Sequence, residues 1–158
     1  MSGFSNAIFE LADNVKTHSE SNYITMCGQF YPKKKLLTFS LGDNGITIPR
    51  VVMTKINDFS FDSDSDAIQW SSLKGNTTKK KYKAGGLGLY VILKSIMENN
   101  GSITIVSNNG YWKRESSGEE IKHEMKNSFR GTLVIFQMDT SITNNINVFN
   151  DGEYELKF

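Results

Sequence analysis

A glutamate and an asparagine one helical turn apart are the first residues of the chain that could do chemistry together. Glu10 and Asn14 are spaced i, i+4, so a helix places both on one stripe, with His18 a further turn along. An asparagine amide oxygen is one of the hard oxygen ligands that Mg²⁺ accepts. A glutamate can polarise a water molecule or take its proton. A solvated helix face explains the same pair without any chemistry.

An aspartate at the end of a predicted strand could bind a purine amine. Asp43 stands in the turn sequence Gly42-Asp43-Asn44-Gly45. Its carboxylate can accept a hydrogen bond from the exocyclic amine of adenine, and Gly45 allows the backbone to approach the ring closely. A plain turn, in which the aspartate side chain bonds its own backbone, accounts for the same residues.

Glycines before a predicted helix could hold phosphate groups. Gly85, Gly86 and Gly88 stand where a helix begins, and backbone N–H groups at a helix N-terminus bind phosphate. A flexible connection explains the same glycines. Four lysines lie just upstream, and for most of them a solvated position is the simpler interpretation: Lys79, Lys80, Lys81 and Lys83.

Hydrophobic periodicity predicts the elements that position these residues. Apolar residues at i, i+3, i+4 and i+7 predict helices over Phe4–Ser19 and Leu89–Asn99. Two β-type runs, Asn22–Tyr31 and Leu36–Leu41, predict an antiparallel pair of strands. A proline at position 49 suits the first turn of a short helix that ends near residue 56.

The remaining segments are more polar. Residues 58–84 are predicted to form a mobile loop, or lid, with one short helix over Ala67–Leu73, because polar segments this long are usually functional or disordered. Three strands are predicted after the second long helix: 102–107, 110–114 and 131–138. Asn108-Asn109-Gly110 is predicted to be a hairpin turn that requires positive φ, and residues 115–128 a charged loop.

This order of elements predicts an α+β fold. Helix, two strands, helix, lid, helix and three strands are typical of a two-layer sandwich, in which a mostly antiparallel sheet carries its helices on one face. We assign residues 1–140 to this domain. Residues 141–158 form a polar C-terminal tail that could end in a short strand at Tyr154–Phe158.

Composition limits the class of protein. Eighteen Lys and Arg nearly balance seventeen Asp and Glu, so no global field favours nucleic acid or an anionic membrane. The chain has neither a stretch long enough to span a membrane nor a signal-peptide pattern, so we expect a soluble, cytoplasmic domain. Cys27 is the only cysteine, which excludes an internal disulfide and a zinc cluster, and its apolar surroundings predict a buried thiol.

Four motifs, taken in order, resemble those of the histidine-kinase-like (GHKL) ATPase superfamily. Residues 10–19 resemble its N box, and Asp43-Asn44-Gly45 the Asp-x-Gly of its G1 box. Gly86-Leu87-Gly88-Leu89-Tyr90 resembles its G2 box, and Gly131-Thr132 the Gly-Thr pair of its last box. The resemblance spans residues 4–138. The superfamily includes histidine kinases, anti-sigma-factor kinases, DNA gyrase and mismatch-repair ATPases, which share the Bergerat fold.

The resemblance implies a role for individual residues. It implies Asn14 as the Mg²⁺ ligand, Glu10 as the catalytic base or water-orienting group, and Asp43 as the partner of adenine. Gly45 would leave room for the ring, and His18 would have an orienting role. The ATP-binding residues that it implies are Asn14, Asp43, Gly45, Gly86, Leu87, Gly88 and Thr132.

The chain departs from the family pattern in three places. Thr47 stands where a second glycine often follows the Asp-x-Gly motif, and Ala67–Thr78 lacks an obvious F box. The helix and strand that usually precede the N box are absent. We therefore expect either the C-terminal part of a longer protein or a trimmed variant.

Two functions follow from the resemblance. The first is a domain that binds Mg-ATP and either hydrolyses ATP or transfers its phosphoryl group to a protein. The alternative is a non-catalytic, nucleotide-gated interaction module, in which ATP orders the lid and a protein partner binds the result. A histidine kinase would need a phosphoacceptor helix upstream, and His123, in a charged segment, is a poor acceptor. We expect ATP or ADP and a protein partner or upstream domain as ligands, but no nucleic acid.

Overall fold

The described residues form one antiparallel sheet with helices on one of its faces. The computed structural model describes residues 3–56, 61–76 and 88–141. The strands lie in the order β1-β2-β4-β3, and each neighbouring pair is antiparallel. They are β1 (Ile24–Tyr31), β2 (Leu36–Asp43), β3 (Ser102–Glu115) and β4 (Glu120–Asp139). The predicted α+β sandwich is therefore confirmed.

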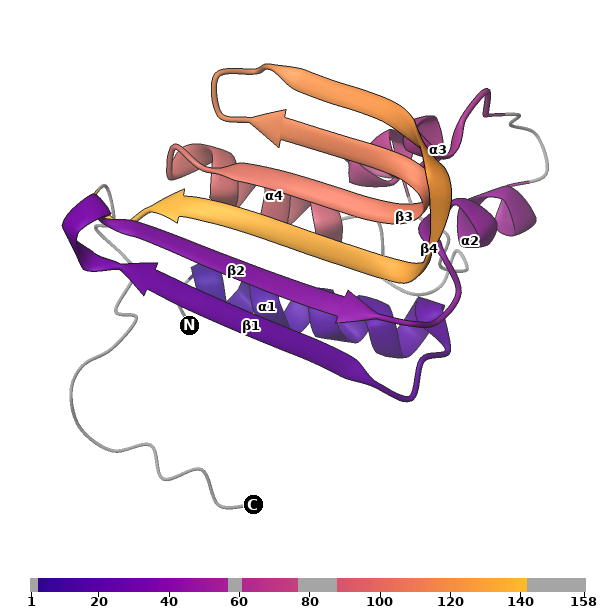
Figure 1. The fold of residues 1–158 in the computed structure, drawn as a ribbon, viewed down its shortest axis with the longest axis horizontal. Helices are drawn as coiled ribbons and strands as arrows, with labels where there is room; N and C mark the ends of the chain where they lie inside the picture. The colour runs from indigo at the N-terminus through magenta and orange to yellow at the C-terminus, as the bar shows by residue number, and fades with distance from the viewer. Residues whose placement is uncertain (1–2, 57–60, 77–87, 142–158) are drawn as a thin grey trace.

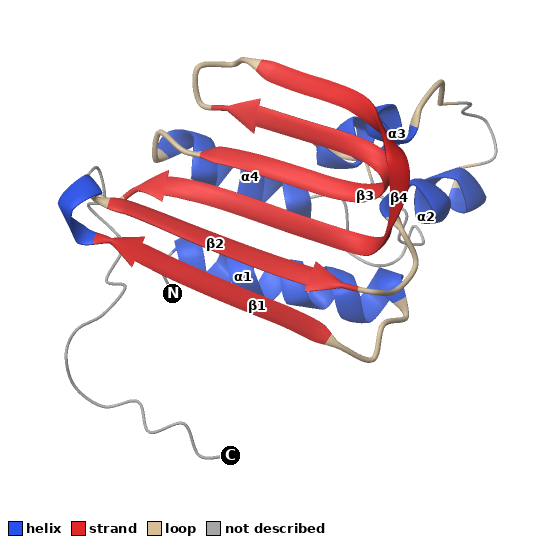
Figure 2. Ribbon diagram, viewed as in Figure 1, coloured by secondary structure: helices blue, strands red, loops and turns tan. Residues whose placement is uncertain are grey.

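The helices gather behind the sheet in the view of Figures 1 and 2. They are α1 (Gly3–Asn14), α2 (Ile48–Lys55), α3 (Asp64–Ser72) and α4 (Gly88–Glu98). The two longest, α1 and α4, pack against each other across the middle of the sheet, while α2 and α3 lie at one end. None of the described helices is both long and apolar enough to cross a membrane.

The first helix changes its winding after Asn14. From Val15 to Ser19 the chain forms a π-helical turn, which ends at Glu20 in the left-handed conformation with φ 54°. The predicted helix over residues 4–19 is confirmed in extent, but its last turn is wider than an α-helix. Such turns are often found at functional sites. The Ser19 hydroxyl donates to the Val15 carbonyl within this turn at 2.9 Å.

The predicted first strand pair is confirmed, with β1 at the edge of the sheet. Its register runs from Ile24 opposite Asp43 to Tyr31 opposite Leu36. Every residue of β1 is exposed, and no described strand pairs with its outer side. The predicted burial of Cys27 is wrong, because the apolar run that contains it is this edge strand.

Two long strands replace the three that were predicted after α4. β3 has 14 residues and β4 has 20, and they join in a turn at residues 116–119. Residues 110–114 pair with residues 120–124, part of the segment that sequence analysis assigned to a charged loop. The prediction of a loop at residues 120–124 is therefore wrong. The polar side chains that suggested a loop contact the helix α3 and do not face solvent alone.

The β3–β4 ribbon bends back on itself at Asn108–Gly110. Asn108 has a φ of 53°, as predicted for this segment, and the pairing register shifts on both sides of it. Figure 1 shows the ribbon turning over at this point. The N–H of Ser116 donates to the Gly101 carbonyl at 2.9 Å, so the ribbon tip returns to the start of β3. The positive φ therefore serves a bulge that bends both strands, and not a two-strand hairpin turn.

The hydrophobic core lies between the helical layer and the inner face of the sheet. The largest side chains with less than 2% exposure include Trp112 and Phe136. Leu11 and Val15 bring the first helix to this core, and Ile92 and Ile96 bring α4. The β4 residues that face this core are Val134, Phe136 and Met138. The next alternate position on the same face, Thr132, is polar.

Candidate functional site

Three polar side chains form a row across the inner face of the sheet. Asp43 on β2 lies opposite Thr132 on β4, which in turn lies opposite Ser107 on β3. Directly opposed residues of antiparallel strands point to the same face, so the three side chains are neighbours. All three are buried, with exposed fractions of 8%, 8% and 0% in that order. Buried polar groups in a row need partners, and each of the three has them.

Ser107 connects three segments of the chain. Its hydroxyl oxygen lies 2.9 Å from the carbonyl oxygen of Gly131, 2.9 Å from the hydroxyl oxygen of Thr132 and 2.9 Å from the backbone nitrogen of Ile48. Ile48 is the first residue of α2. Ser107 therefore joins the start of α2 to Gly131 and Thr132 on β4.

Asp43 carries a buried carboxyl group. One of its oxygens accepts a hydrogen bond from the N–H of Gly45 at 2.8 Å. Burial raises the pKa of Asp43 above its ordinary value of 3.8, while the hydrogen bond from the Gly45 N–H partly offsets this rise in pKa. An acceptor held in low dielectric discriminates strongly between ligands that can donate to it and ligands that cannot.

The turn after β2 is packed against the end of the first helix. The N–H of Ile46 donates to the Ser19 carbonyl at 2.5 Å. A Cβ atom at Gly45 would overlap that same carbonyl, so only glycine allows this approach. The expectation that Gly45 leaves room for a ring stays a prediction, and the contact with Ser19 is a separate reason for glycine.

A second close approach joins β4 to the same turn. Gly131 has a φ of 91°, and a Cβ atom there would overlap the carbonyl oxygen of Asp43. Three of the four sequence motifs thus meet at one end of the sheet: the end of the N box, the Asp-x-Gly turn and the Gly-Thr pair. They do so through backbone contacts that tolerate no side chain at Gly45 or Gly131.

Asn14 and Glu10 both lie on α1, one turn apart. Asn14 is its last residue, half-buried, where the π-helical turn begins. Because that turn has more than four residues per revolution, the half-buried His18 remains on the same side of the helix as Asn14. This turn ends at Ser19, whose carbonyl contacts the Asp43–Gly45 turn. Asn14 is therefore little more than one helical turn away from that contact.

The fourth motif borders the residues that the structure describes. Gly86 and Leu87 lie outside them, and Gly88 is the first residue of α4. The other end of α4 is tied to the far end of the sheet, since the Asp139 N–H donates to the Asn99 carbonyl at 3.0 Å. The helix therefore starts toward the end of the sheet that carries the polar row, as a phosphate-binding N-terminus would require.

Ser107 stands outside the motifs by which the sequence indicates a site. Its signal is a polar residue that continues the buried alternation of Ile103 and Ile105, where a third apolar residue would be expected. A serine at the end of such a run indicates a hydrogen-bonded position at the rim of the core. Asp43 and Thr132 were found through their motifs.

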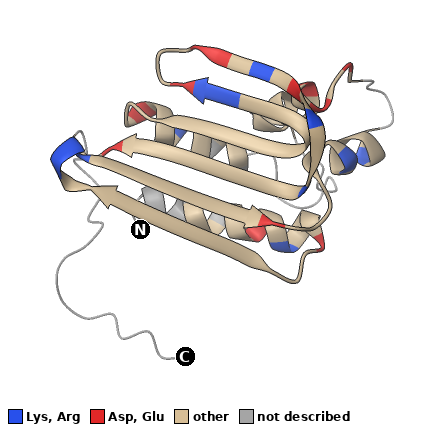
Figure 3. Cartoon of the chain, viewed as in Figure 1, with Lys and Arg blue, Asp and Glu red and all other residues tan. Residues whose placement is uncertain are grey.

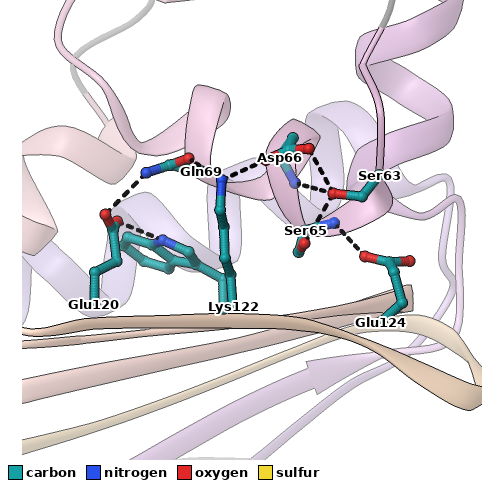
Figure 4. Close-up of polar contacts among 8 residues, drawn as sticks. Ser63, Ser65, Asp66, Gln69, Glu120, Lys122 and Glu124 are labelled. Carbon is teal, nitrogen blue, oxygen red and sulfur yellow. Dashed lines mark hydrogen bonds and ion pairs between the residues drawn. The ribbon is translucent and has the colours of Figure 1, made fainter.

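A second polar cluster, shown in Figure 4, lies between α3 and the bent ribbon. Glu120 accepts from the indole N–H of Trp112 at 2.6 Å and from Gln69 at 2.8 Å. Lys122 pairs with Asp66 at 2.5 Å, and Glu124 accepts from the N–H of Ser65 at 2.9 Å. Every member has a partner within the cluster, so it attaches α3 to the ribbon. Figure 3 shows that Lys, Arg, Asp and Glu positions are frequent on this ribbon, whereas most of β1 and β2 is free of them.

Comparison with known proteins gives one family. The model of the family described as histidine kinase-, DNA gyrase B-, and HSP90-like ATPase matches residues 2–142. The matched range contains α1, the whole sheet and every residue of the polar row. No curated protein matches the chain.

Proposed function

The chain belongs to the family of histidine kinase-, DNA gyrase B- and HSP90-like ATPases, and we propose that its polar row binds the adenine of Mg-ATP. It is thus an ATP-binding domain of the GHKL type, as the four motifs predicted. The observation that supports this location is the pairing of Asp43 with Thr132. Two buried polar groups on neighbouring strands face the same side, beside the turn that Gly45 and Ser19 close.

The proposed orientation of the nucleotide follows from the chain's own residues. Asp43 accepts a hydrogen bond from the adenine amine, and Thr132 lies beside it on the next strand. The phosphates then extend toward Gly88 at the start of α4, where backbone N–H groups are unpaired by the helix itself. Gly86 and Leu87, which the resemblance assigns to the same contact, precede that residue in the sequence.

Asn14 and Glu10 are the proposed metal and catalytic residues. An amide oxygen at the end of α1 has the chemistry that Mg²⁺ prefers, and a single protein ligand of this kind suits a metal that is otherwise held by phosphate oxygens and water. When bound, Mg²⁺ would neutralise charge on the phosphates. Glu10, one turn earlier, orients or deprotonates the attacking water or the protein hydroxyl that accepts the phosphoryl group.

A thermal-unfolding experiment tests the proposed site. Mg-ATP at about 100 times its dissociation constant should stabilise the fold by about 2.7 kcal/mol, which raises the melting temperature. GTP, with a carbonyl in place of the amine, should give a smaller shift at the same concentration. The Asp43→Asn variant should show a smaller ATP-dependent shift than the parent. A folded sample whose melting temperature does not respond to millimolar Mg-ATP would contradict the proposal.

A further inference from the structure

The hydroxyl of Ser107 has as many partners as a serine can have. It is fully buried, and three polar atoms lie within hydrogen-bond distance of its oxygen, each at 2.9 Å. A serine hydroxyl can donate one hydrogen bond and accept two. The identities of the three partners therefore decide which way each hydrogen bond runs.

Two of the three directions are fixed by chemistry. The Gly131 carbonyl can only accept, so its contact with Ser107 is a hydrogen bond only if Ser107 donates. The single proton of Ser107 is therefore used there. The Ile48 N–H can only donate, so it occupies one lone pair of the Ser107 oxygen. The contact with Thr132, taken by itself, could run either way. Because the Ser107 proton is already used, the proton in that contact must come from Thr132.

This leaves the Thr132 hydroxyl with lone pairs but no free proton. We propose that Ser107 is a specificity-determining residue. It acts by fixing Thr132 as a hydrogen-bond acceptor next to the purine base of the nucleotide. Thr132 and Asp43, on opposed positions, then form a pair of acceptors. This inference rests on the proposed function of the row as the adenine site.

A pair of acceptors favours a base that presents donors. The 6-amino group of adenine supplies N–H groups to this side of the site, directly or through water. The 6-carbonyl of hypoxanthine or guanine places an acceptor against two acceptors and leaves buried groups unpaired, which is the usual source of strong discrimination. With Thr132 free to rotate its proton, the site could donate to a carbonyl. Ser107 thus disfavours a carbonyl at the purine 6-position without contact to the base.

The test is the ratio of ATP to ITP affinity in the Ser107→Ala variant. Inosine triphosphate is the probe because it replaces the amine by a carbonyl, carries a proton on N1 and lacks the 2-amino group of guanine. The parent should prefer ATP. Alanine at position 107 releases the Thr132 proton, so the preference should fall by about tenfold, the effect of one hydrogen bond. A purely structural role would weaken the binding of both nucleotides by the same factor.

The matched control is Ser72→Ala. Ser72 is also buried, its hydroxyl donates to the Gln69 carbonyl, and it lies on α3, away from the row. This variant should lose stability without a change in the ratio. If Ser107→Ala does not fold, Ser107→Cys is measured instead, since a thiol keeps the side-chain size but is a weak acceptor.

Each result separates this inference from the proposed function. A parent that binds ATP and ITP equally overturns the inference but leaves ATP binding intact. The inference is also overturned, with ATP binding intact, if the parent prefers ATP but the ratio of ATP to ITP affinity is unchanged or larger in Ser107→Ala or Ser107→Cys. A folded parent that binds neither nucleotide overturns both proposals together.

Discussion

At the scale of single residues, Asp43 is held where its charge is disfavoured. Burial raises the pKa of Asp43, so the folded protein keeps this proton to a higher pH than the unfolded chain does. The free energy of unfolding therefore falls as pH rises from near 3.8 through the folded pKa, and stays lower above it. The family motif thus retains a residue that the fold alone would not favour, as is common where function requires a destabilising group.

Replacement of Asp43 by asparagine should separate stability from binding. The new side chain keeps an oxygen for the Gly45 N–H but carries no charge, so the fall in unfolding free energy above pH 3.8 should disappear. ATP binding should weaken by about 1–3 kcal/mol, because an amide N–H₂ group would face the adenine amine. Denaturant unfolding between about pH 4 and pH 7 and calorimetric titration with ATP measure the two effects. Unchanged ATP affinity would exclude Asp43 as the adenine partner.

Asn14 and Glu10 should fail in different ways, although they share one helix. Asn14→Ala should abolish the gain in nucleotide affinity that magnesium provides, since it removes the proposed metal ligand. Glu10→Ala should leave Mg-ATP affinity nearly unchanged and lower turnover by about 10²–10⁴-fold. Affinity with and without magnesium, and phosphate release, are the measurements. Turnover that is the same in parent and Glu10→Ala would show that Glu10 is not the base.

The predictability of the site also differs from residue to residue. Asp43, Thr132 and Asn14 could be proposed as site residues from the sequence because they stand in short motifs with fixed neighbours. Ser107 stands in no motif, and its importance depends on Gly131 and Ile48, which are 24 and 59 positions away. Such contacts are set by strand register and cannot be seen in local periodicity.

At the scale of elements, the bent ribbon is the main difference between expectation and structure. Alternation of apolar and polar residues predicted strands well where one face is apolar, as in β2 and the start of β3. In the segment 120–124 the face toward α3 is occupied by Glu120, Lys122 and Glu124. Because the face of this segment that packs against α3 is polar and Ile121 on its other face is exposed, it resembles a loop in sequence. Its strand conformation depends on pairing with residues 110–114 and on partners in α3.

Glu120 provides a test of this attachment. Glu120→Ala should reduce the free energy of unfolding by about 1–3 kcal/mol, because the indole N–H of the fully buried Trp112 loses its acceptor. Glu120→Gln keeps an acceptor oxygen and should recover most of the loss. The neighbouring Glu119→Ala, at an exposed position, should change stability by less than about 0.5 kcal/mol. Equal effects of Glu120→Ala and Glu119→Ala, measured by denaturant unfolding, would refute this role of Glu120.

At the scale of the whole molecule, three distant parts of the chain meet through backbone contacts. Ser19, Gly45 and Gly131 come from the first helix, the turn after β2 and the last strand. The family motifs predicted that these parts would share a site. The sequence does not specify that Gly45 approaches Ser19, because a glycine in a turn has several explanations and only the packing of helix on sheet selects one.

Gly45→Ala should disrupt that meeting point. Its Cβ would overlap the Ser19 carbonyl, so the turn or the helix end must move, at a cost of about 1–3 kcal/mol in unfolding free energy. Gly42→Ala is the matched control, since a Cβ there would lie 3.4 Å from the Leu133 side chain, an ordinary contact. Thermal unfolding of the two variants gives the comparison. Similar melting temperatures for both would mean that the Ser19 contact adjusts without cost.

The exposure of Cys27 makes one thiol of this chain chemically addressable. It is the only cysteine in the sequence, and it lies on the edge strand, on the face of the sheet that the helices do not cover. A maleimide dye or a nitroxide spin label would therefore attach at a single position without first removing other thiols. The label would lie away from the buried row at the end of β2, so its signal could follow nucleotide binding without blocking the nucleotide.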